Sequence, residues 1–394
     1  MGPAPTINTG IEDIAFHRNI GHSGEIREGQ VTNRRQFLRS SAAAGLCFVG
    51  CGLAGTPHAH AQGAGRRREV AVNGKRARTI DIHAHCMIPA ALAAMGEATV
   101  TAAGPVLTSY PGLYLDAADK RMRAMDEQGI DMEVLSINPI WYSLEREAAA
   151  RVIEIQNEAL AQFSAAHADR FLAFASVALQ HPDLAVAQLE KAIKRQGLRG
   201  VAVGASVAGV DFASAKFHPF WAKCEELGIL VFIHPQSTPQ LRDRFKGNGL
   251  LSNVIGNPLD TTIALSHLIF EGTLDRFPGL KICAAHGGGY LGSYAPRSDH
   301  GCLTFPDQCD KSIVLKKKPT EYLRDIYVDN IVFTPEAMRH LDAEIGYGRI
   351  MLGSDYPLPW EDHAVDVILS APGATDAQKI AMLGGTAAAL LGIK

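Results

Sequence analysis

The sequence predicts an α/β domain of the (β/α)8 barrel class, on three observations. From residue 79 onward, eight short apolar or β-branched runs each precede a helix-like segment. Most of these runs are continuously apolar, as in parallel strands that are buried on both faces. Polar side chains follow several runs directly, where the active sites of such barrels lie. A doubly wound open sheet is the alternative, but it usually carries a glycine-rich turn after its first strand, which here ends in His83-Ala84-His85.

The expected strands and helices alternate along the chain. Strands are predicted at 79–85, 132–137, 171–177, 200–203, 229–234, 281–286, 326–332 and 350–354. Helices are predicted at 117–128, 145–166, 183–196, 219–227, 261–276, 290–297, 336–345, 364–369 and 375–391. Gly129, Gly197 and Gly228 occupy helix C-cap positions. The barrel domain is therefore expected to span 79–394.

Composition and charge exclude several classes of protein. The chain has 394 residues, 47% of them hydrophobic, and a formal net charge of −3, so it is neither disordered nor fibrous. A near-neutral balance without a long basic run argues against nucleic acid as a partner. After residue 61, no apolar stretch reaches the roughly 18 residues that a membrane span needs.

The first 61 residues resemble an export signal and not part of the fold. Arg34-Arg35 followed by Phe37-Leu38 resembles a twin-arginine signal, and a charge-free, weakly apolar stretch comes next. The small residues at 59 and 61 provide a cleavage site. We expect export to the periplasm, a linker at 62–78, and no stable membrane anchor after processing.

The cysteines do not indicate a structural zinc cluster. Cys47 and Cys51 leave with the signal, and no CxxC pair occurs in the sequence. Cys302 and Cys309 could form a disulfide in an oxidising compartment, which their spacing alone leaves open.

Histidines and an aspartate at the predicted strand ends indicate a metal site. His83 and His85 are two residues apart, so both imidazoles face the same side of the first strand. His234 ends the fifth strand and Asp355 follows the eighth, on the same expected barrel rim. Three nitrogens and one carboxylate suit one divalent ion, Zn²⁺ first, with Mn²⁺ as an alternative. The fourth strand carries no Lys, Glu or Cys that could bridge two ions, so we expect a mononuclear site.

Several longer motifs resemble the amidohydrolase-related metal-dependent hydrolases. These motifs are DIHAH at 81–85, FIHP at 232–235, AAHGGG at 284–289 and LGSDYP at 352–357. Within that family, the chain is most similar to the branch of aminocarboxymuconate-semialdehyde decarboxylase. The segment RMRAMDEQGID at 121–131 is similar to a helix motif of that branch.

The resemblance implies roles for individual residues. His83, His85, His234 and Asp355 would be metal ligands, and His286 would be the general acid/base. In a hydrolysis reaction, Asp355 would also move protons together with His286. Arg121 and Arg297 would bind a substrate carboxylate, Arg297 in the neighbouring subunit of a homodimer.

Trp141 follows the second predicted strand directly, so its indole could flank a flat substrate. The alternative is that the indole packs under a loop.

The expected function is metal-dependent decarboxylation of a small unsaturated or aromatic carboxylic acid. A metal-dependent hydrolase of a lactone, ester or amide would use the same ligands, so it remains the alternative. An exported metal-binding protein without turnover is a third possibility. In each case, the partner is a small molecule and not a nucleic acid.

Overall fold

A computed structural model describes residues 67–102, 111–115, 118–236, 238–358, 360 and 363–393 of the chain. The predicted export signal at 1–61 and the first part of the linker lie outside the described residues. No helix among the described residues has the length and apolarity needed to cross a bilayer.

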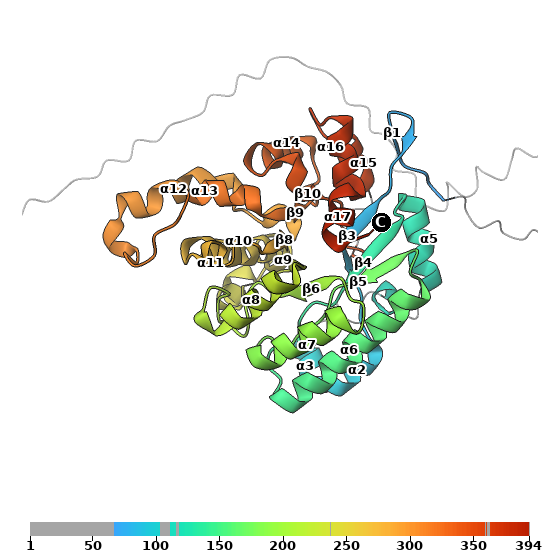
Figure 1. Ribbon diagram of the computed structural model, residues 1–394, viewed down its shortest axis with the longest axis horizontal. Coiled ribbons are helices and arrows are strands. Elements are labelled where there is room, and N and C mark those ends of the chain that lie inside the picture. Colours follow the sequence, from blue (N-terminus) through green and yellow to red (C-terminus); the bar gives the residue numbers. More distant parts are fainter. Residues whose placement is uncertain are drawn as a thin grey trace, which may run out of the picture. The chain divides into compact units, whose positions relative to one another are not determined.

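Within the described residues, eight parallel strands form the centre of the domain, as the sequence predicts (Figure 1). All eight lie within the predicted strand ranges; β6 has the predicted bounds, and the other seven are shorter, most of them because the runs continue into loops at their carboxyl ends. They are β3 (Ile80–His85), β4 (Met132–Ser136), β5 (Phe171–Ala173), β6 (Gly200–Val203), β7 (Leu230–Ile233), β8 (Lys281–Ala284), β9 (Tyr327–Asp329) and β10 (Ile350–Met351).

Backbone hydrogen bonds join the two sheets, β3-β4-β5 and β6-β7-β8-β9-β10, into a closed ring. On one side, Ala175 N donates to Gly200 O at 2.8 Å, which connects the end of β5 to β6. On the other side, Ile82 N donates to Leu352 O and Asp355 N donates to His83 O, both at 2.9 Å, which connects β3 to the end of β10. The molecule is therefore a (β/α)8 barrel and not an open sheet.

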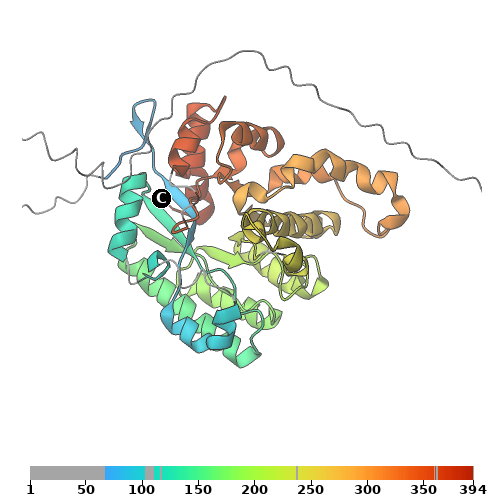
Figure 2. The ribbon, with the colours of Figure 1, turned by 180° about the vertical axis from the view of Figure 1, so that it is seen from behind.

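The helices surround the strands (Figures 1 and 2). They include α5 (Ala118–Gln128), α6 (Arg146–Ala166), α7 (Pro182–Lys194), α8 (His218–Leu227), α10 (Gly256–Phe270), α14 (Pro335–Glu344) and α15 (Ala364–Leu369). The helix expected at 261–276 is divided into α10 and α11 (Thr273–Arg276) because Gly272 adopts a left-handed conformation, with φ of 70°. The last predicted helix comprises α16 (Asp376–Ile380), a π-helical turn (Ala381–Gly385) and α17 (Thr386–Leu391).

Two apolar layers stabilise the barrel. Side chains that point into the ring form a small inner core, in which Phe174 of the β5 end and Phe232 of β7 stack with ring centroids 5.7 Å apart. Side chains that point outward form a larger core with the helices. Since both faces of each strand are buried, the strands read as continuous apolar runs.

Several short elements were not expected from the sequence. They are the hairpin β1 (Ala71–Val72) and β2 (Lys75–Arg76), and the helices α2 (Pro89–Met95), α3 (Glu97–Ala102), α9 (Leu251–Val254) and α13 (Pro319–Tyr322). Together with α12 (Ala295–Thr304), α13 lies outside the ring of helices (Figure 1). A disulfide between Cys302 and Cys309 connects the end of α12 to the segment that follows it.

Candidate metal centre and active site

Four predicted ligands meet at the carboxyl ends of the barrel strands. His83 and His85 occupy β3, His234 follows β7 directly, and Asp355 lies in the loop after β10. One ligand atom from each of the four lies within 4.8 Å of the others, and all four residues are buried. Residues separated by 272 positions thus converge because parallel strands of a closed ring end at the same rim.

The distances within this cluster are those of groups that share a cation. His83 Nε2 and His85 Nε2 are 3.1 Å apart. Asp355 Oδ1 lies 2.7 Å from His85 Nε2 and 3.3 Å from His83 Nε2. The buried His234 Nε2 has no hydrogen-bond partner among the described residues. A buried polar atom without a partner is costly, and a bound ion would satisfy it.

In His83 and His234, a hydrogen bond at Nδ1 turns the ring so that Nε2 faces the cluster. His83 Nδ1 donates to Asp329 Oδ2 at 2.7 Å, and His234 Nδ1 donates to the carbonyl oxygen of Pro235 at 2.8 Å. Each ring is thereby set in the tautomer in which Nε2 is free to bind a metal. The donor set fits one divalent ion.

Burial and neighbouring charges shift the pKa values of the three cluster histidines in different directions. Burial lowers the pKa of His85, and it lowers the pKa of His234 well below its usual range, so both imidazoles are neutral, as metal ligands must be. Burial also opposes a charge on His83, but the carboxylates of Asp355 and Asp329 raise the pKa of His83 to about 10. The two carboxylates therefore favour a positive charge at this position, and a bound divalent cation would provide that charge.

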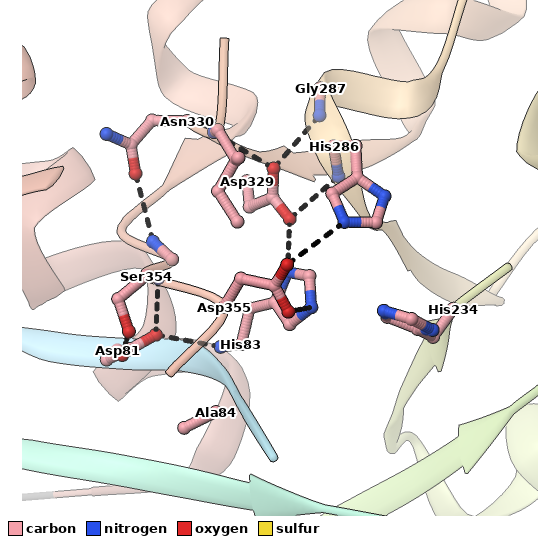
Figure 3. Close-up of polar contacts among 12 residues, drawn as sticks. Asp81, His83, Ala84, His234, His286, Gly287, Asp329, Asn330, Ser354 and Asp355 are labelled. Atoms are coloured by element: carbon pink, nitrogen blue, oxygen red, sulfur yellow. Dashed lines mark hydrogen bonds and ion pairs between the residues drawn. The ribbon is translucent and has the colours of Figure 1, made fainter. Parts of the chain in front are cut away.

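His286 lies beside the cluster, at the end of β8. Its Nε2 is 3.7 Å from Asp355 Oδ2, and its ring centroid is 5.3 Å from that of His234 (Figure 3). The His286 ring also borders a cavity, so it can reach both the ligand Asp355 and a molecule in that cavity. This position agrees with the predicted acid/base role, which stays a prediction.

The cavity next to His286 has a volume of about 210 Å³. Its walls are mostly apolar and aromatic, with two carboxamides. The lining residues are Asn253, Val254, Asn257, Pro258, His286, Gly289, Tyr290, Ile331, Phe333, Asp355 and Trp360. A larger hollow of about 360 Å³ beside α5 contains none of the four predicted ligands, so the smaller cavity is the candidate active site.

Arg121 does not face this cavity, and the expectation that it binds the substrate carboxylate is wrong. Its guanidinium is buried and donates to Glu133 Oε2 at 2.7 Å, to His85 O at 2.6 Å and to Gly112 O at 3.0 Å. It also stacks on the ring of Tyr356. Because its guanidinium bonds protein groups, Arg121 supports the backbone of the ligand His85 and does not bind a substrate.

Trp141 also differs from its predicted role. The indole is fully buried, and its Nε1 donates to Val177 O at 2.9 Å, so Trp141 packs in the outer core and does not flank a substrate. Arg297 is exposed on α12 and is absent from the described lining of the cavity. Within one chain, neither arginine therefore contacts the candidate active site.

Two carboxylates outside the predicted ligand set hold the site together; the sequence predicted no role for Asp81 itself and left open whether Asp329 faces the site. Asp81 accepts hydrogen bonds from His83 N at 2.9 Å and from the hydroxyl of Ser354, the residue before Asp355. Asp329 bonds His83 and the backbone of His286 (Figure 3). The only available signal was that Asp81 lies on the HxH strand and that Asp329 ends a strand.

Comparison with known families agrees with this geometry. Residues 80–393 match the model of a family described as Amidohydrolase. A 2-amino-3-carboxymuconate-6-semialdehyde decarboxylase from Dictyostelium discoideum is 31% identical over 278 residues, which cover 70% of this chain and 76% of the relative. A gamma-resorcylate decarboxylase from Rhodococcus jostii is 28% identical over 306 residues, covering 71% of this chain and 91% of the relative.

Solved structures share the fold. A 5-carboxyvanillate decarboxylase from Sphingomonas paucimobilis superposes with a TM-score of 0.73 at 26% identity, covering 80% of this chain and 99% of that one. A dihydroxybenzoic acid decarboxylase from Polaromonas sp. JS666, solved with manganese and 2-nitroresorcinol, has a TM-score of 0.68 at 24% identity, covering 80% and 97%.

Removal of one proposed ligand should remove the metal. We expect His234→Ala to lower the content of the purified protein from about one divalent ion per chain to a small fraction, because one of four donors is lost. Metal content is measured by plasma mass spectrometry. His267→Ala, which changes a half-exposed histidine bonded to Glu271, is the matched control and should keep its metal. Equal metal content in the two variants would contradict the ligand assignment.

Loss of the buried arginine should destabilise the barrel. Arg121→Met leaves Glu133 as an uncompensated buried carboxylate, so we expect the free energy of unfolding to fall by about 3–5 kcal/mol. Adding Glu133→Leu should restore part of this loss, because the unpaired charge is then removed. Urea denaturation of the single and double variants measures both effects. If Arg121→Met were as stable as Arg297→Met, the supporting role of Arg121 would be refuted.

Proposed function

Because the chain belongs to the amidohydrolase family, in the branch of 2-amino-3-carboxymuconate-6-semialdehyde decarboxylase, we propose that it is a metal-dependent decarboxylase of a small aromatic carboxylic acid. One observation carries the proposal: a buried cluster of three histidines and one aspartate adjoins a ring-sized cavity that His286 lines. The curated relatives at 28–31% identity described above are decarboxylases of unsaturated or aromatic acids.

His83, His85, His234 and Asp355 would hold the metal. A divalent ion bound there supplies a Lewis acid that stabilises negative charge on a substrate oxygen. Zn²⁺ was the first expectation, but three imidazoles and a carboxylate accept Mn²⁺ as well. We therefore propose one divalent ion per chain and leave its identity to the metal analysis.

His286 would donate the proton to the substrate, with Asp355 beside it. In the proposed reaction, the bond between the ring carbon and the carboxylate breaks, CO₂ leaves, and the electron pair stays on the ring carbon. A protonated His286 gives its proton to that carbon, which forms the new C–H bond in place of the broken C–C bond. Asp355 Oδ2, 3.7 Å from His286 Nε2, would orient the imidazole for the transfer. The neutral imidazole then regains a proton from solvent.

The cavity favours an aromatic substrate with a single carboxylate. A cavity of roughly 150 Å³ is enough for benzene, so about 210 Å³ accommodates one substituted ring. Tyr290, Phe333 and Trp360 offer aromatic surfaces, and two asparagine side chains can bond neutral hydroxyl groups. No described lining residue is Lys or Arg, and the undescribed internal residues contain neither type. A second carboxylate would therefore lack a partner from the same chain.

Turnover of aromatic acids tests the proposal. Metal-loaded protein should release CO₂ from hydroxybenzoates with one carboxyl group, and we expect kcat/KM for the corresponding dicarboxylates to be at least about tenfold lower, since an unpaired buried charge is costly. His286→Asn should lower kcat by about 10²–10⁴-fold while metal content stays at one per chain, because only the proton donor is removed.

The outcomes separate the three candidate functions. Hydrolysis of lactones or esters without CO₂ release would favour the hydrolase. Full metal content without turnover of any acid or ester would favour the metal-binding protein. Undiminished turnover by His286→Asn would refute the assigned acid.

We further propose that the enzyme is a homodimer in which Arg297 serves the neighbouring site. The exposed apolar side chains Tyr294, Leu303 and Phe305, which are 73%, 79% and 65% exposed, occur on and next to α12, the helix that carries Arg297. Exposed apolar surface of this kind is typical of a subunit interface. The partner's arginine would bind the single substrate carboxylate, for which the lining of one chain offers no Lys or Arg, and a second carboxylate would still lack a basic partner.

Subunit mixing tests the shared site. Arg297→Ala and His286→Asn chains should each be nearly inactive alone. When they are co-expressed with different tags, the mixed dimer should recover about half of the wild-type activity per dimer, because one of its two symmetric sites then has both residues. A mixed dimer that stays inactive, or a monomeric protein, would contradict the proposal.

We also propose export through the twin-arginine pathway. The disulfide between Cys302 and Cys309 supports it, because disulfides persist in oxidising compartments such as the periplasm. Replacing Arg34 and Arg35 with lysine should retain the precursor in the cytoplasm, as measured by cell fractionation, whereas Arg39→Lys should leave export intact. Equal export of both variants would refute a twin-arginine signal.

A further inference from the structure

A buried carboxylate outside the ligand set connects a proposed metal ligand to the backbone of the proposed proton donor. Asp329 is the last residue of β9, it is fully buried, and no role was assigned to it above beyond its contacts. Its Oδ2 accepts from His83 Nδ1 at 2.7 Å and from His286 N at 2.9 Å. Its Oδ1 accepts from Gly287 N at 2.9 Å and from Ile331 N at 3.1 Å. Four donors thus converge on two oxygens.

The first of these bonds determines which nitrogen of His83 can bind a metal. Since Asp329 can only accept, Nδ1 of His83 carries a proton, and Nε2, which faces His85 and Asp355, is the nitrogen left to bind a metal. A group that donated to Nδ1 would place the proton on Nε2 and block the ligand.

The backbone bonds hold His286 in an unusual conformation. His286 has φ of 57° and Gly287 has φ of 63°, in the left-handed region that residues with a side chain rarely adopt. Such strain persists only where neighbouring groups impose it. Asp329 bonds the amides of both residues, so it fixes the turn that directs the His286 ring toward the cavity (Figure 3).

An asparagine could not replace this aspartate. The four partners of the carboxylate are all N–H donors, two on each oxygen. A carboxamide has one oxygen and one NH₂ group, so two donors would face the NH₂ whichever way it turned. The adjacent Asn330 shows the contrast: its amide donates to Ala364 O and accepts from Gly353 N, which suits one donor and one acceptor.

We propose that Asp329 is a positioning residue that couples metal binding to the placement of the proton donor, by setting the His83 tautomer and the His286–Gly287 turn with the same carboxylate. This inference rests on the proposed metal site and acid, and it assigns Asp329 no contact with the substrate.

Asp329→Asn, studied in the mature chain, tests the coupling. We expect Mn²⁺ affinity, measured by chelator competition, to fall by about 10–100-fold, and the visible spectrum of the Co²⁺-loaded protein to change. Hydrogen exchange of the 286–288 amides should accelerate by at least tenfold, and kcat should fall with KM nearly unchanged at saturating metal.

Asp131→Asn is the matched control. Asp131 is also buried and accepts from a backbone amide, Thr79 N, but it lies where β4 begins, at the opposite end of the barrel. It should leave all four readouts unchanged.

A measurement on the wild-type protein keeps the test decisive if Asp329→Asn does not fold. Removal of the metal from the wild-type protein should change the exchange rate at the 286–288 amides, because the ion that holds the His83 ring, a partner of Asp329, is then absent. Unchanged exchange there, or an Asp329→Asn protein whose Mn²⁺ affinity lies within twofold of wild type, overturns the coupling. Metal affinity and exchange need no substrate, so failure to find a decarboxylated acid would refute the proposed function and leave this inference standing.

Discussion

The candidate site depends on burying three imidazoles and several carboxylates where the strands of a closed barrel end. Buried charges are tolerated only when they are paired, and here Asp355 and Asp329 face the histidines on two sides. The resulting demand for positive charge raises the pKa of His83, while burial keeps His85 and His234 neutral. A cation-binding centre follows from this combination, and the cavity beside it places a substrate next to the same charge.

Three buried acids around the ligands have separate tasks. Asp81 bonds the backbone of His83 and the residue before Asp355, so it fixes two ligand-bearing segments to each other. Glu133 pairs with Arg121, which in turn supports the carbonyl of His85. Asp329 bonds a ligand ring and the turn of the proton donor. The geometry of the site is thus maintained by residues that face away from the substrate, as is usual for metal sites.

The corrections to Arg121 and Trp141 share one physical reason. Arg121 was assigned to the site by the resemblance to the decarboxylase branch, and Trp141 because it follows a strand. Both side chains instead bond polar groups of the protein itself. Arg121 bonds a carboxylate and two carbonyls, and Trp141 bonds Val177 O. The sequence shows that Arg121 can bind a carboxylate, but it does not show which one. Glu133 and the backbone carbonyls can accept its hydrogen bonds as well as a substrate can.

The sequence by itself determined the barrel, its eight strands and the four predicted ligands, because apolar runs buried on both faces and residues at strand ends are local patterns with a fixed spatial meaning in a parallel barrel. Only the tertiary structure decided which polar partners the other residues have. The tautomer of His83, the left-handed turn at His286 and the burial of Arg121 depend on contacts between elements that are far apart in the chain. Such contacts leave no repeating pattern in the sequence, because each is a single bond between one side chain and one group on a distant element of the barrel.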